Sequence, residues 1–105
     1  MTDYRIENLA DIITNYSVNI KKDNVVFING TEISLPLVKS VYKKVLEKGA
    51  HPEVRMFTEE LMEIFYKNAS KKQLKYISEI SKYIIENADI MIHIRGGWNT
   101  KSLSN

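Results

Sequence analysis

Histidine is the residue type in this chain best suited to proton transfer or metal binding near neutral pH, and the chain has two, His51 and His93. They lie far apart in the sequence, and neither has a histidine or carboxylate at a ligand spacing such as H-x-x-x-H. His51 belongs to the stretch GAHP, where we expect a helix to give way to a strand, so we interpret it as a residue of that junction. His93 falls near the carboxyl end of an expected strand. Ligands often bind there in open parallel sheets, so His93 is the better candidate for contact with a substrate.

Other arrangements that support catalysis or cofactor binding are missing from the sequence. It contains no G-x-G-x-x-G, no G-x-x-x-x-G-K-[ST], no G-x-S-x-G and no cysteine. Thr31 and Ser34 precede an expected helix and could accept an anion there, although such residues mostly cap helices. Glu59, Glu60 and Glu63 cluster at the start of another helix, where negative charge is stabilising in any case. We therefore predict no catalytic, cofactor-binding or metal-binding residue in this chain.

Composition restricts the class of protein. A length of 105 residues suits one domain, and 44% hydrophobic residues suffice for a modest core. Fifteen basic and thirteen acidic residues give a net charge of +2, which is too balanced to attract nucleic acid or a membrane surface. The absence of cysteine is compatible with a reducing compartment, and no apolar run approaches the ~20 residues that cross a bilayer. We expect a cytoplasmic domain that binds neither nucleic acid nor membrane.

Hydrophobic periodicity predicts the order of helices and strands. Apolar residues at helical spacing indicate helices over residues 4–17, 37–48, 59–68 and 70–88. Short apolar runs indicate strands over residues 25–29, 53–57 and 89–94. The second helix carries the widest apolar stripe, suited to lying on a sheet, and it consists of Leu37, Val38, Val41, Tyr42, Val45 and Leu46. The last helix is expected to present one continuous face, formed by Leu74, Ile77, Ile80, Ile84 and Ala88.

Residues with special backbone or capping properties predict where these elements begin and end. The Asn29-Gly30 pair should break the first strand. Pro36 fits the first turn of the following helix, and Gly49 fits its left-handed C-terminal cap. Thr58 should cap the third helix, and the stretch SKKQ that begins at Ser70 is typical of a capping box.

Strands that alternate with helices predict a parallel sheet. The strand at residues 25–29 has four consecutive apolar residues and should lie in the middle, whereas residues 53–57 alternate and suit an edge. The expected fold class is therefore α/β, a three-layer arrangement in which helices pack on a small parallel sheet with the first strand central. It is Rossmann-like but lacks a dinucleotide motif.

Three collinear stretches also resemble a known family. They are LADIITNYSVNIKKDNVVFING, LPLVKSVYKKVLEKGAHPEVRMF and ADIMIHIRGGWNTKSL, and the resemblance spans residues 6–103. In order and spacing they resemble the N-terminal domain of the thermophilic metalloaminopeptidases, the aminopeptidase T or leucyl aminopeptidase family. Each stretch is weak alone, but the three together, correctly spaced, are fairly specific.

The resemblance implies more than this chain contains. Members of the family are hydrolases that remove N-terminal residues from peptides with two divalent metal ions, of the zinc or cobalt type, held by a C-terminal catalytic domain. The family pattern carries none of the metal ligands within residues 1–105. The resemblance therefore implies that the chain is the N-terminal α/β domain of a longer two-domain protease and is inactive alone. It further implies a homodimer in which this domain contributes to the cavity wall and the subunit contacts.

A second interpretation remains open from the residues alone. A small α/β domain without a self-contained active site could equally be a stand-alone binding or protein-interaction module. A nucleotide-binding module is disfavoured, because the turn after the first strand, NGTEIS, lacks the glycine pattern that phosphates require.

Overall fold

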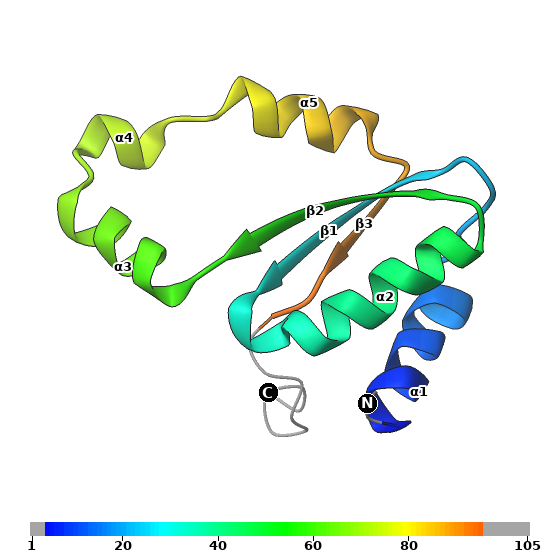
Figure 1. The fold of residues 1–105 in the computed structure, drawn as a ribbon. Coiled ribbons are helices and arrows are strands. Elements are labelled where there is room, and N and C mark those ends of the chain that lie inside the picture. Colours follow the sequence, from blue (N-terminus) through cyan, green and yellow to red (C-terminus); the bar gives the residue numbers. More distant parts are fainter. Residues whose placement is uncertain (1–3, 96–105) are drawn as a thin grey trace.

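Three parallel strands form the centre of the computed structural model, which describes residues 4–95 (Figure 1). The strands are β1 (Val25–Thr31), β2 (His51–Phe57) and β3 (Ile90–His93), and their order in the sheet is β2-β1-β3. Both pairings are parallel, so the predicted α/β class with the first strand central is confirmed. The expected edge position of β2 is confirmed as well.

Strand β1 is longer than the sequence predicts. The Asn29-Gly30 pair does not break it, because both residues pair in register with β2 and the strand continues to Thr31. Val26 and Ile28 are buried in the main core. Phe27 points to the opposite face of the sheet by strand alternation and is also buried. Burial on both faces explains why this stretch is apolar without alternation.

Helix α2 (Leu35–Glu47) packs on one face of the sheet and supplies much of the core. Its buried apolar residues are Leu37, Val38, Val41 and Val45, and Pro36 lies in its first turn as predicted. Tyr42 and Leu46, which we also expected on the sheet, are 40% and 53% exposed. A helix turns 100° per residue, so a stripe as wide as the predicted one cannot all reach a flat surface.

Helix α1 (Tyr4–Ile12) lies beside α2 and continues into one π-helical turn, Ile13–Ser17. The expected helix over residues 4–17 is therefore present, but its last turn is wider. Lys44 of α2 joins the two helices, since its Nζ lies 2.9 Å from Asp11 Oδ1 and 3.2 Å from Glu7 Oε2. The hydrogen bond to Asp11 is the main reason that the pKa of Lys44 is raised above its ordinary value, although burial opposes the shift.

Residues 58–88, which we call the arm, connect β2 to β3 and contain α3 (Glu59–Asn68), α4 (Lys71–Lys75) and α5 (Glu79–Asn87). Figure 1 shows the arm as an arc on the side of the sheet away from α1 and α2. None of its residues is buried. The three-layer arrangement is thus present, but the layer that the arm forms is open.

Side-chain caps mark the first residue of each of the three helices of the arm. The Thr58 hydroxyl accepts a hydrogen bond from the N–H of Leu61, and Ser70 and Gln73 form the predicted capping box. The single helix expected over residues 70–88 is wrong. Tyr76 adopts an extended conformation, and Ser78 then accepts a hydrogen bond from the N–H of residue 81 and starts a new helix. The side-chain cap competes successfully with continuation of the helix.

Candidate binding cleft

A cleft of about 960 Å³ opens between α3 and the carboxyl ends of the three strands. In a parallel sheet of order β2-β1-β3, the connection from β1 to β2 and the connection from β2 to β3 cross opposite faces of the sheet. In open α/β sheets, ligands commonly bind outside the carboxyl ends of the strands, where the connections change face. The lining comes from the ends of all three strands, from the turn after β1 and from α3.

The wall that α3 provides is apolar. Leu61, Met62, Phe65 and Tyr66 line the cleft from positions that repeat at three- and four-residue intervals, so they form one stripe of the helix. The stripe is open to solvent, with Tyr66 68% exposed. An apolar surface with few polar groups is typical of a site that binds an apolar side chain or segment.

One polar pair lies at the floor of the cleft. The amide Nδ2 of Asn29, on β1, is 3.2 Å from Nδ1 of His93, on β3, and the two residues are register partners. An amide nitrogen only donates, so Nδ1 accepts and the neutral ring carries its proton on Nε2. His93 therefore lies in the cleft as its strand-end position suggested. Its partner in the described structure is an amide and not a nucleophile.

The second polar feature is the tight turn from β1 into α2. Ser34 Oγ donates to the carbonyl of Thr31 at 2.8 Å and accepts from the N–H of Thr31 at 2.9 Å. These contacts hold the turn and use the Ser34 hydroxyl as a cap, which was the more ordinary of its two predicted roles. Gly30, just before the turn, permits the close approach of α2 to β1, because a Cβ there would lie 2.6 Å from Cγ2 of Val38.

His51 lies at the opposite end of the sheet from the cleft. Its N–H donates to the carbonyl of Asn24 at 2.7 Å, and its Nε2 is 3.3 Å from Oδ1 of Asp23. Gly49 just before it has φ of +77°, the predicted left-handed cap, and Asp23 has φ of +67°. The interpretation of His51 as a junction residue is confirmed, and its ring contacts the carboxylate of Asp23.

Charge is unevenly distributed along the mouth of the cleft. Glu59 follows β2 and Glu32 follows β1, whereas Arg95 follows β3.

Within residues 4–95, no group of three or more histidine, aspartate or glutamate side chains is placed to hold a metal ion. The same residues include no helix that is both long and apolar enough to span a membrane.

Sequence reasoning missed this cleft. The apolar stripe of α3 was visible in the spacing of its residues, but nothing in the sequence showed that it faces strand ends and not a closed core. The pairing of Asn29 with His93 was also missed, since it depends on the register of two strands that are 64 residues apart. Hydrophobic patterning fixes which face a strand buries and leaves its exact pairing partner open.

Comparison with curated proteins finds no match. Comparison with protein families finds one, described as thermophilic metalloprotease (M29), which matches residues 2–105 and hence nearly the whole chain. The match agrees with the resemblance that the three collinear stretches carry. The chain therefore belongs to the thermophilic metalloprotease family M29.

Proposed function

We propose that this chain is the non-catalytic N-terminal domain of a metal-dependent aminopeptidase that hydrolyses N-terminal residues from peptides. The observation that carries the proposal is the family match over residues 2–105 in a fold whose described residues provide a binding cleft. Family membership implies a metal-dependent peptide hydrolase, and the open cleft implies a surface that completes a larger site.

The residues present do not fit the metal centre that the family implies. A two-metal site needs several carboxylates or histidines that converge on ions about 3.5–4 Å apart. The two histidines lie at opposite ends of the sheet, and within the described residues no acidic group joins either of them in a cluster of three. We therefore assign the metal ions to a separate catalytic domain and assign no catalytic step to the residues of this chain.

The cleft gives this domain a role beside such a catalytic domain. Its apolar wall and mixed-charge mouth suit a surface that borders the route of a peptide, as a wall of an enclosed cavity would. The catalytic domain and a second subunit are the partners that this role requires. A reducing cytoplasm is the compartment we propose, in keeping with a chain that contains no cysteine.

Two measurements test the proposal. The purified 105-residue chain, with added Zn²⁺ or Co²⁺, should release no product from leucine p-nitroanilide. The protein translated from the complete native reading frame should hydrolyse this compound in a metal-dependent way. Metal-dependent turnover by the short chain would contradict the non-catalytic role. A native reading frame without a second domain rich in carboxylates and histidines would also contradict it, and it would favour a stand-alone interaction module.

A further inference from the structure

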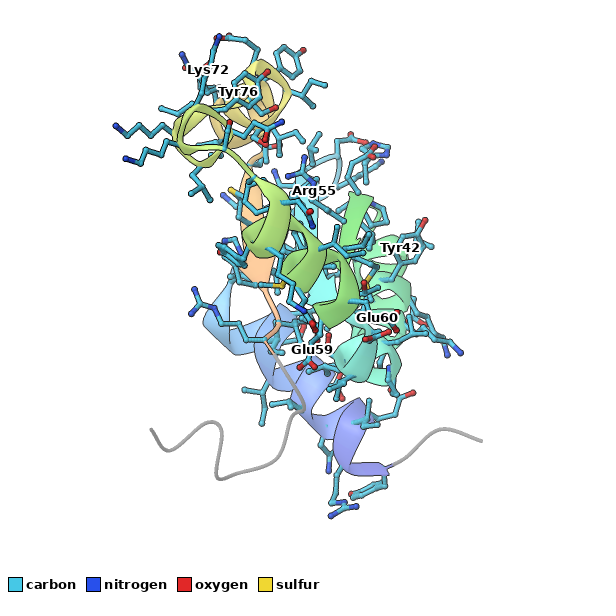
Figure 2. All side chains as sticks on the ribbon, turned by 90° about the vertical axis from the view of Figure 1, so that its left-hand side faces the viewer. Tyr42, Arg55, Glu59, Glu60, Lys72 and Tyr76 are labelled. Carbon is cyan, nitrogen blue, oxygen red and sulfur yellow. The ribbon has the colours of Figure 1, made fainter. Side chains whose placement is uncertain are left out.

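Arg95 gives the cleft a basic edge. It follows β3, lines the cleft and, within residues 4–95, forms no ion pair with Glu32 or Glu59. Among the described lining residues it carries the one positive charge, because the lysines of α4 lie elsewhere: Figure 2 shows Lys72 beyond the far end of α3 from Glu59. An unpaired guanidinium beside an apolar wall is suited to a carboxylate, to which it donates two parallel hydrogen bonds.

His93 adds a second donor on the same side of the cleft. Its Nδ1 accepts from the Asn29 amide at 3.2 Å, so Nε2 carries the proton, and that N–H has no partner among the described residues. Residues two apart on a strand lie on the same face, and the N–H of Ile94 still donates to the carbonyl of Asn29 at 2.8 Å just after β3. His93 and Arg95 are therefore on one face at the β3 edge, and both line the cleft.

The opposite edge of the cleft is acidic. Glu59 follows β2 and Glu32 follows the central strand β1, and both side chains are exposed. Carboxylates accept hydrogen bonds from peptide N–H groups, and these bonds are stronger than bonds between neutral groups. The cleft thus has acceptors toward β2 and donors at β3, with the apolar stripe of α3 alongside them.

The distance between the two edges sets the length of a ligand that reaches both. Neighbouring strands are about 4.8 Å apart, so the two outer strands of the order β2-β1-β3 are about 9.6 Å apart. An extended peptide advances about 3.3 Å per residue, so about three residues span this width. A peptide of this length has apolar side chains to place against α3 and one carboxylate to place at β3.

We propose that the cleft binds the last three residues of an apolar peptide in an extended conformation, with the terminal carboxylate against Arg95 and Nε2 of His93. The N–H groups of the peptide then face Glu32 and Glu59. The inference rests on the proposed function only in that it names the part of a peptide substrate that this domain holds. The guanidinium selects a charged end over an uncharged one, and the stripe of α3 selects apolar side chains.

Four ligands test the site on the purified chain by isothermal titration calorimetry. The test peptide is N-acetyl-leucyl-alanyl-leucine, whose blocked amine prevents cleavage by an aminopeptidase. Its C-terminal amide lacks the carboxylate, N-acetyl-triglycine lacks the apolar side chains, and octanoate has an apolar chain and a carboxylate but no peptide bond. The test peptide should bind with a Kd of about 1 mM or lower, and each of the other three should bind at least about fivefold more weakly.

Two variants, each with a matched control, test the assigned residues. Arg95→Gln removes the cation of the cleft, and Lys39→Gln removes an exposed cation from α2. Leu61→Asn makes the wall of α3 polar, and Ile80→Asn makes the same kind of change at an exposed residue of α5 outside the cleft. Circular dichroism confirms that each chain is folded. The two cleft variants should raise the Kd of the test peptide at least about fivefold, and the two controls should change it less than about twofold.

Several results would overturn the proposal. They are no binding of the test peptide, equally tight binding of the amide, of N-acetyl-triglycine or of octanoate, a cleft variant with wild-type affinity, and a control that loses as much affinity as its cleft variant. All of these measure binding and none measures hydrolysis. A failure here therefore leaves the non-catalytic role to the turnover measurement, and turnover by the short chain would leave the binding result standing.

Discussion

Replacing Gly30 with alanine tests how the floor of the cleft is built. A Cβ at this position would lie 2.6 Å from Cγ2 of Val38, 3.2 Å from Oγ of Ser34 and 3.3 Å from Sδ of Met56. The methionine can rotate away because its side chain is flexible. Val38 cannot, because it is β-branched, only 3% exposed and fixed between α2 and the sheet. The substitution must therefore displace α2 from β1.

The expected change in the free energy of unfolding is the difference between two opposing effects. Inserting a methyl group into a packed core costs about 1–3 kcal/mol. Replacing glycine in a strand returns about 0.5–1 kcal/mol, because the unfolded chain loses conformational freedom. The free energy of unfolding should thus fall by about 1–2 kcal/mol, measured from urea denaturation followed by far-ultraviolet circular dichroism.

A double-mutant cycle separates this clash from a general loss of packing. Val38→Ala removes the methyl group that the new Cβ meets, so it should cost at least ~1 kcal/mol less in the Gly30→Ala background than in the wild type. Val45→Ala removes the same volume two turns further along α2, and its cost should be the same in both backgrounds. Gly30→Ala at wild-type stability, or equal coupling to both valines, would refute the close approach of α2 to β1.

The other predictions concern single contacts. Lys44→Met should lower the free energy of unfolding by about 1 kcal/mol at pH 7. The folded-state pKa of Lys44 is raised, so its contribution is fully present below the unfolded-state pKa and is lost as the pH rises through the higher folded-state value. Wild type and variant should therefore converge in urea titrations as the pH rises through that value. Thr58→Ala should increase hydrogen exchange at the first amides of α3 at least several-fold, because it removes the cap of that helix. The global free energy of unfolding should change by less than about 0.5 kcal/mol, because α3 buries no residue. A large loss of global stability would contradict the open arm. Ser40→Ala should raise stability by about 0.5–1 kcal/mol in thermal unfolding, since its buried hydroxyl has no hydrogen-bond partner among the described residues. The ¹⁵N chemical shifts of His93 should show the proton on Nε2, and Asn29→Ala should remove this preference; a proton on Nδ1 would contradict the bond.

The sheet and the core were predictable from sequence because each of their signals is local. An unbroken apolar run placed β1 at the centre, and the alternation after Pro52 placed β2 at an edge. Pro52 itself suits an edge, since the N–H of His51 points to β1 and the next backbone nitrogen points to the free side. The strand ends were less predictable. Glycine is common in turns, so Gly30 predicted a break in the strand. Its small size instead allows α2 to pack close to β1, a contact that only the tertiary structure reveals.

The break in the last predicted helix has the largest consequence for the path of the arm. The apolar residues from Leu74 to Ala88 fit one helical stripe, which predicted continuity, and the capping ability of Ser78 carried too little weight against that pattern. A continuous helix over residues 71–87 would be a straight rod about 25 Å long. With the break, the chain bends between α4 and α5, and the arm arches around the strand ends. The bend places α5 near the sheet, where Arg55 donates to the Ser81 hydroxyl at 3.3 Å, and leaves α3 away from it. The apolar stripe of α3 lines the cleft with the strand ends.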